Sequence, residues 1–166
     1  MKDRVSCRLG LTAADLANEL KIAYLPEECR QINNPDQKDA CIQTYSESQK
    51  CWQFDIGQQR NSCLKDMLNI TDISAQKDNC QNNADCNANL KNNVYTLAKF
   101  KIYDLEERAE EMLDKNLITK DQAATIITQL EQDKILFNQA INKNGRITAL
   151  NAAKTHWIAF INEVRK

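Results

Sequence analysis

Cysteine is the residue type whose positions in this chain most clearly suggest chemistry. All seven cysteines lie in the first 86 of 166 residues, and from Cys29 to Cys86 successive members are 12, 10, 12, 17 and 6 positions apart. Thiolates bind zinc well, but zinc sites usually include two ligands about two to four residues apart. The chain has no such cysteine pair and a single histidine. The spacing therefore favours disulfides, and we expect no metal and no cofactor.

An internal repeat organises four of these cysteines. Residues 29–32 (CRQI) recur 22 positions later as residues 51–54 (CWQF), and residues 37–42 (QKDACI) recur in the same register as residues 59–64 (QRNSCL). Self-similarity at a fixed period indicates duplication of one structural unit.

The repeat also predicts how the cysteines pair. A residue that interrupts helices lies midway between the two cysteines of each repeat, Pro35 in the first and Gly57 in the second. Each repeat therefore reads as a helical hairpin closed by its own disulfide. The expected bonds are Cys29–Cys41 and Cys51–Cys63.

A nested pairing, in which the two inner cysteines bond inside the two outer ones, is the alternative. Apolar residues between positions 35 and 56 recur at helical spacing, so the inner cysteines, Cys41 and Cys51, are expected on one continuous helix. Ten residues of helix separate two Cα atoms by about 15 Å, whereas a disulfide requires about 4.4 to 6.8 Å. A nested pattern would need a turn near residues 46–48, which no Gly or Pro marks. The pattern of two hairpins is favoured.

The three remaining cysteines form one close pair and an odd member. Cys80 and Cys86 flank Asn82 and Asn83 and can close a small loop across them. Cys7 lies 22 residues before the first repeat, but Glu19 occupies the position where its partner would stand. We hypothesise that Cys7 is free or forms an intermolecular disulfide.

His156 and a run of acidic residues are the other candidates for catalysis. A catalytic histidine needs a nucleophile or carboxylate within hydrogen-bond reach, and the neighbours of His156 in sequence supply neither, so a surface histidine is predicted. Carboxylates on one helix face could hold a metal, but a solvated face is favoured, and the Glu-x-x-His motif of di-iron bundles is missing. The run comprises Asp104, Glu106, Glu107, Glu110 and Glu111. No catalytic residue is assigned, and the protein is predicted not to be an enzyme.

One modification motif is present. Asn69-Ile70-Thr71 fits the acceptor pattern for N-glycosylation and lies between two predicted helices, where it would be accessible.

Capping signals position the helices of the cysteine-rich half. Thr12 opens a helix over residues 11–25, and Asn34 caps the next helix at Pro35. A third helix is expected over residues 58–69, and Thr71 or Asp72 caps a short helix that ends near Asn82. The third helix buries Cys63, Leu64, Met67 and Leu68.

The second half has the periodicity of three longer helices. The first spans residues 89–115, and Thr119 with Gln122 forms a capping box for the second, which is expected to end at Asn144-Gly145. The apolar seam of the first is Val94, Ala98, Ile102, Leu105, Ala109 and Met112; that of the second is Ala123, Ile127, Leu130, Phe137 and Ile141. The third is lined by Ile147, Leu150, Trp157, Ile161 and Val164. Short connections predict a three-helix antiparallel bundle.

Composition sets the fold class. The chain has three Gly and two Pro, too few for the turns of a β-sandwich or a doubly wound α/β fold. We predict an all-α protein in which disulfide-stapled helical hairpins precede the bundle. The domains are residues 1–88 and residues 89–166, or one continuous domain.

Charge gives no sign of a polyanionic partner. The net charge is −1, from 22 basic and 23 acidic residues that are interspersed along the chain, so neither nucleic acid nor an anionic membrane is implied. No apolar stretch approaches the length of about 20 residues that a spanning helix needs. A protein partner that the sequence does not identify is expected, and a homo-oligomer is compatible with the odd cysteine.

The residues around the second repeat cysteine carry a resemblance. Residues 38–45 (KDACIQTY), followed by Cys51 and Phe54, resemble the basic-acid-x-Cys-aromatic motif of predicted secreted archaeal and other microbial proteins, with Ile42 where an aromatic is usual. The resemblance covers about 40 of the 166 residues. It implies an extracytoplasmic helical repeat.

These observations favour a non-enzymatic binding or structural module outside the cytoplasm, because disulfides persist in oxidising compartments. The location would be secreted, periplasmic or at the cell surface. One alternative is a ligand-binding or periplasmic chaperone-like protein that uses an apolar groove between its halves, and another is a metal-binding protein.

Overall fold

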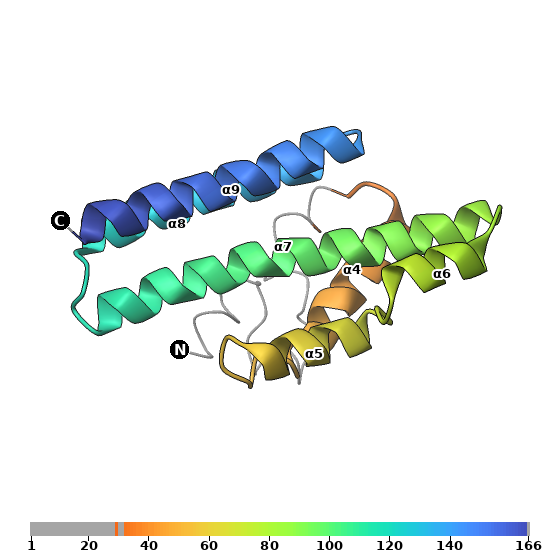
Figure 1. The fold of residues 1–166 in the computed structure, drawn as a ribbon, viewed down its shortest axis with the longest axis horizontal. Coiled ribbons are helices and arrows are strands. Elements are labelled where there is room, and N and C mark those ends of the chain that lie inside the picture. The colour runs from red at the N-terminus through yellow and green to blue at the C-terminus, as the bar shows by residue number, and fades with distance from the viewer. Residues whose placement is uncertain (1–28, 30–31, 166) are drawn as a thin grey trace. The chain divides into compact units, whose positions relative to one another are not determined.

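The computed structural model describes residue 29 and residues 32–165 of the chain, and this part has six helices and no strand. The fold is therefore all-α, as predicted (Figure 1). The helices are α4 (Pro35–Ser48), α5 (Gln58–Met67), α6 (Ile73–Cys80), α7 (Ala84–Asp114), α8 (Lys120–Gln139) and α9 (Lys143–Val164). The helix predicted over residues 11–25 and the odd cysteine, Cys7, lie outside the described residues.

The chain divides into two compact units within α7, after Leu97. The predicted division after residue 88 was placed where the cysteines end, whereas α7 runs through it without a break. Each unit is described by itself. No helix in the described part is long and apolar enough to span a membrane.

The first helix described in the cysteine-rich unit begins where the sequence predicts. Asn34 accepts a hydrogen bond from the Gln37 backbone N–H through its side chain, and Pro35 occupies the first turn of α4. Pro fits this position because the first N–H groups of a helix have no partner within the helix.

The predicted continuous helix through Cys51 is wrong, because α4 ends at Ser48. The Ser48 hydroxyl donates to the Tyr45 carbonyl at 2.7 Å, and the Gln49 N–H bonds to Ser46 three residues back rather than to Tyr45. Residues 49–54 continue as turns with the same three-residue spacing of hydrogen bonds. Cys51 therefore lies in a turn, and the first arm of the second repeat is not a helix.

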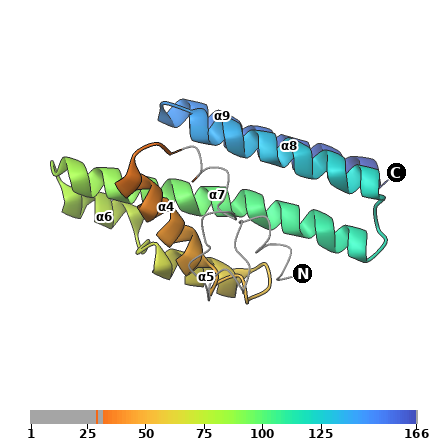
Figure 2. The same cartoon turned by 180° about the vertical axis from the view of Figure 1, so that it is seen from behind.

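Short helices follow, each with an identifiable start. Gly57 is the N-cap of α5, and the Asp72 side chain caps α6 by accepting from the backbone N–H groups of Ser74 and Ala75. The Asn83 side chain accepts from the Cys86 N–H and so caps α7 at Ala84, earlier than the predicted start at residue 89. Figures 1 and 2 both show α6 alongside the first turns of α7.

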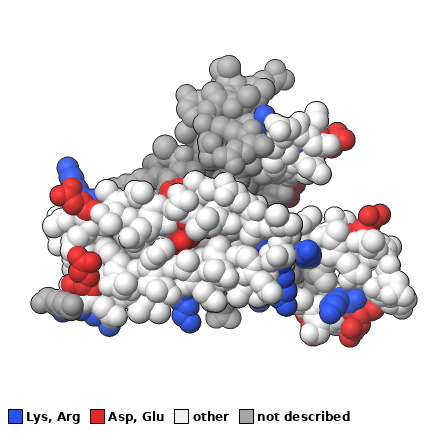
Figure 3. Space-filling model, turned by 90° about the horizontal axis from the view of Figure 1, so that it is seen from above, with Lys and Arg blue, Asp and Glu red and all other residues white. Residues whose placement is uncertain are grey.

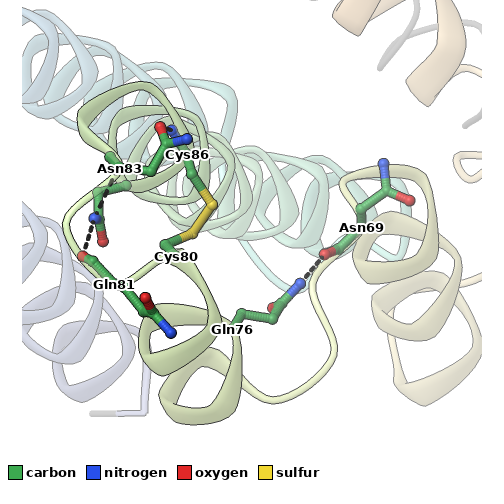
Figure 4. The surroundings of a disulfide bond; sticks show 7 residues. Asn69, Gln76, Cys80, Gln81, Asn83 and Cys86 are labelled. Atoms are coloured by element: carbon green, nitrogen blue, oxygen red, sulfur yellow. Dashed lines mark hydrogen bonds between the residues drawn. A yellow bond between two sulfur atoms is a disulfide. The ribbon is translucent and has the colours of Figure 1, made fainter.

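Three disulfides hold this unit together, and each bridges one turn. Their Cα–Cα distances are 5.7, 5.5 and 5.4 Å, within the normal range for a disulfide. They join Cys29 to Cys41 and Cys51 to Cys63, as the repeat predicts, and Cys80 to Cys86, as the short spacing of that pair predicts. Two of them tie a helix to the segment before it, and the third joins the end of α6 to the first turn of α7 (Figure 4).

The second unit contains the end of α7 with α8 and α9, the predicted antiparallel helices. The Thr119–Gln122 capping box is formed at the start of α8. The predicted helix stop at Asn144-Gly145 is wrong, because α8 ends at Gln139 and Asn142 caps α9 by accepting from the Gly145 N–H. The Asn-Gly pair therefore lies in the first turn of the next helix. Figures 1 and 2 show α8 and α9 side by side along their length.

The core of this unit is apolar and contains no cysteine among the described residues. Its buried members are Ile102, Ala109, Ile118, Ala123, Ile126, Leu130, Ala153 and Phe160. Most predicted seam residues contribute, but Ile141 is 98% exposed and Ile147 is 43% exposed. Both were misplaced because the turn between α8 and α9 comes earlier than predicted.

Candidate functional site

A groove on the cysteine-rich unit is the first candidate site. It is open to solvent, has a volume of about 710 Å³ and runs along α5 and the turns before it. It is lined by Lys50, Phe54, Gln58, Gln59, Ser62, Cys63, Asp66 and Met67. The Cys51–Cys63 disulfide ties the turn that carries Phe54 to the helix that supplies most of the lining.

A buried arginine fixes the turn at one end of the groove. Arg60 is 1% exposed, and its Nε and Nη2 donate to the Phe54 carbonyl at 2.9 and 2.6 Å. Its guanidinium lies 4.7 Å from the centre of the Trp52 ring. The Trp52 indole N–H in turn donates to the Ser48 hydroxyl at the end of α4. Arg60, on α5, therefore holds the Phe54 backbone in place from across the turn.

The groove has the chemistry of a binding surface. Phe54 and Met67 supply apolar area, Gln58 and Gln59 supply amide donors and acceptors, and Lys50 and Asp66 carry opposite charges. Among the described residues that line the groove, the one cysteine is bonded in a disulfide and there is no histidine. The groove can hold an apolar side chain and hydrogen-bond to a peptide, but these described residues offer no pairing of nucleophile and base.

The second candidate site is a buried charged cluster in the unit that contains the end of α7, α8 and α9. The Lys134 side chain is 4% exposed, and its Nζ lies 3.0 Å from Glu106 Oε1 and 2.9 Å from Glu131 Oε1. The same Nζ lies 3.6 Å from the centre of the Tyr103 ring. The Glu106 side chain is fully buried. Since a buried charge must be compensated, Lys134 links α7 to α8 by its charge as well as by packing.

The predicted solvated acidic face is therefore wrong in part. Asp104, Glu106 and Glu107 are buried, and only Glu110 and Glu111 of the run are partly open to solvent. The sequence did contain a signal. The α8 seam steps from Leu130 to Phe137, and the core-facing positions between them are Asp133 and Lys134. Charged residues at core positions indicate a buried network.

His156 has a partner that its neighbours in sequence do not reveal. Its Nδ1 lies 2.8 Å from Oδ2 of Asp133, 23 residues earlier on α8. The Asp133 side chain is 2% exposed and that of His156 is 40% exposed, so the histidine lies at the surface, as predicted, while its carboxylate partner is buried. A buried carboxylate that receives an Nδ1–H bond fixes the tautomer and orientation of the ring.

The described contacts do not assemble a catalytic centre around this pair. A His–Asp pair becomes catalytic when a nucleophile or substrate atom lies within hydrogen-bond reach of the other ring nitrogen, and among the described residues only Asp133 is in polar contact with His156. The described residues also hold no group of three or more His, Cys, Asp or Glu side chains placed to bind a metal.

Charge on the visible surface is also unspecialised. On the face drawn in Figure 3, basic and acidic side chains are scattered over a mostly uncharged surface, and the described residues of that face form no large patch of one sign. An interaction with a polyanion would need such a patch.

Comparison of the chain with protein-family models, with curated proteins and with solved structures gave no match.

Proposed function

We propose that this protein is a non-enzymatic extracytoplasmic binding module whose disulfide-bonded helices hold a protein-binding groove rigid. The observation that carries the proposal is that each disulfide closes one turn of the cysteine-rich unit and that one of them forms part of the groove. Local cross-links of this kind stabilise small domains in oxidising compartments.

The occupant that best fits the groove is a peptide segment of a partner protein. Phe54 and Met67 are partly buried apolar side chains that a partner's apolar residue can contact. Gln58 and Gln59 are exposed on the first turn of α5, where their amides can pair with peptide groups. A rigid site loses less conformational entropy on binding than a mobile one. The disulfide and Arg60 both supply such rigidity.

The test is cross-linking on intact cells that produce the protein, with a reagent that does not cross membranes. Capture of a partner that then binds the purified protein supports both the location and the role. Phe54→Ala and Met67→Ala should each weaken that binding by at least about tenfold, because apolar anchors of an interface contribute on the order of 2 kcal/mol.

Gln53→Ala is the matched control. Gln53 is exposed and adjacent to Phe54 but does not line the groove, so binding should stay within about twofold. Equal losses for all three variants, or labelling that requires cell lysis, would contradict the proposal.

A further inference from the structure

The turn between α5 and α6 contains a motif that the proposed function does not use. Asn69 is the one asparagine in the sequence with Ser or Thr two positions later and a residue other than Pro between them. Both Asn69 and Thr71 are exposed, whereas the intervening Ile70 is 3% exposed. The buried Ile70 anchors the turn, and the two acceptor-motif side chains lie on its outer side.

Helix termination explains the backbone of Asn69. The Asn69 N–H donates to the Asp66 carbonyl at 3.1 Å and the Ile70 N–H donates to the Lys65 carbonyl at 2.8 Å, which are the two bonds of a Schellman motif. Asn69 has φ of 51°, a left-handed conformation that asparagine tolerates better than most residues. Its side chain points away from Gln76 in Figure 4.

A single glutamine holds the rest of the turn. Gln76 Nε2 donates to the Asn69 carbonyl at 2.6 Å (Figure 4), and Gln76 Oε1 accepts from the Thr71 N–H at 3.2 Å. Thr71 was one of two predicted caps for α6, but Asp72 caps that helix. Helix capping therefore does not explain the Thr71 hydroxyl. The hydrogen bonds that form the turn use neither the Asn69 nor the Thr71 side chain.

A second turn in the chain serves as an internal comparison. At the end of α7, the N–H groups of Asn116 and Leu117 bond to Leu113 and Met112 in the same Schellman pattern, and Asn116 has φ of 53°. Two positions after this asparagine stands Ile118, which is 7% exposed. Asn116 thus has the backbone geometry of Asn69 but lacks the hydroxyl residue that the acceptor motif requires.

We propose that Asn69 is the acceptor of an N-linked glycan. The bond formed joins Asn69 Nδ2 to C1 of the first sugar, and Nδ2 loses one proton. The bond broken is that between C1 and the phosphate oxygen of a lipid-phosphate-linked oligosaccharide, and the lipid phosphate leaves with the electron pair. The inference rests on the proposed function, because the donor class and its transferase act outside the cytoplasm. Asn69 lies two residues after Met67, which lines the groove at the end of α5.

The experiment is glycopeptide mass spectrometry of the protein from the cells that naturally produce it. The Asn69 peptide is expected to carry a glycan mass, and the Asn116 peptide is expected to be bare. In the same cells Thr71→Ala should abolish the modification and Thr71→Ser should retain it. Both variants keep asparagine at the left-handed position, so loss of folding does not confound them. Asn69→Asp, which also tolerates this conformation, should be unmodified.

The oxidation state of the cysteines, measured on the same sample, separates the two proposals. If Asn69 carries no glycan while the six paired cysteines are oxidised, the glycosylation proposal is wrong and the proposed binding module stands. A bare Asn69 with reduced cysteines would overturn both. A glycan that survives Thr71→Ala would show that this motif is not the acceptor.

Discussion

Some residues in this protein bond to close neighbours in the sequence, and others bond to residues far away along the chain. Asn34, Thr119 and Gln122 bond to backbone within three residues, and local sequence predicted all of these contacts. Lys134 and Glu106 are 28 residues apart, and no local rule connects them. The apolar seam could show that a charged residue occupies a core position, but it could not name the partner.

The buried pair gives the first prediction. Lys134→Met should lower the free energy of unfolding by about 3 kcal/mol or more, because it leaves the fully buried Glu106 without its compensating ammonium. Adding Glu106→Gln to that variant should recover part of the loss. Urea denaturation of the full chain measures both effects.

Lys115 supplies the control for this prediction. Its ion pair with Glu111 is exposed, with side chains 63% and 25% accessible, so Lys115→Met should change the free energy of unfolding by less than about 1 kcal/mol. An equal loss at both lysines would mean that burial does not determine the effect.

Helix boundaries were predicted well where a capping residue marks them and poorly where a helix ends without a Gly or Pro, or where a competing cap overrides the stop signal. The starts of α4 and α8 follow from Asn34 and Thr119. The end of α4 depends on a hydroxyl bond of Ser48 and on its contact with Trp52, which no Gly or Pro signals. The pair Asn144-Gly145 is typical of a helix end, but Asn142 is the N-cap of α9, so the pair lies in the first turn of that helix.

The capping box of α8 gives a prediction at this scale. Thr119→Ala removes the acceptor for the Gln122 N–H and should cost about 1 kcal/mol of unfolding free energy, measured by thermal or urea denaturation. Thr125→Ala in the same helix is the control. Its hydroxyl donates to the Asp121 carbonyl within the helix, so that variant should be neutral or slightly stabilising. The reverse order of the two variants would contradict the assignment of the cap.

At the scale of the whole molecule, the two units should respond differently to reduction. The core of the unit from Ala98 onward contains no cysteine, whereas all six bonded cysteines lie before Leu97. The Cys29–Cys41 and Cys51–Cys63 disulfides should each contribute about 3 kcal/mol to the free energy of unfolding. This is comparable with the total stability of a small domain, which is about 5 kcal/mol at the low end. Reduction of the disulfides should therefore destabilise the cysteine-rich unit much more than the other unit.

Hydrogen exchange of the intact chain, before and after reduction and alkylation, tests this difference. Amides of α8 and α9 should keep their protection, and amides of α4 to α6 should lose most of theirs. Loss of protection throughout would show that the bundle depends on the cysteine-rich half and that the chain is one continuous domain.

Cys7 lies outside the described residues, and the three disulfides of the described part use the other six cysteines. A free thiol or an intermolecular bond therefore remains the expectation from the sequence. A second copy of this chain is one candidate for the intermolecular partner.

Disulfide mapping of the protein taken from its own cells, with free thiols alkylated at harvest, tests both the repeat-by-repeat pairing and the oxidising location. Digestion without reduction should yield three linked peptide pairs, Cys29 with Cys41, Cys51 with Cys63 and Cys80 with Cys86. A link between Cys41 and Cys51 would contradict the repeat-by-repeat architecture. Alkylated thiols at the repeat cysteines would contradict an oxidising location, and with it the binding module proposed for this chain.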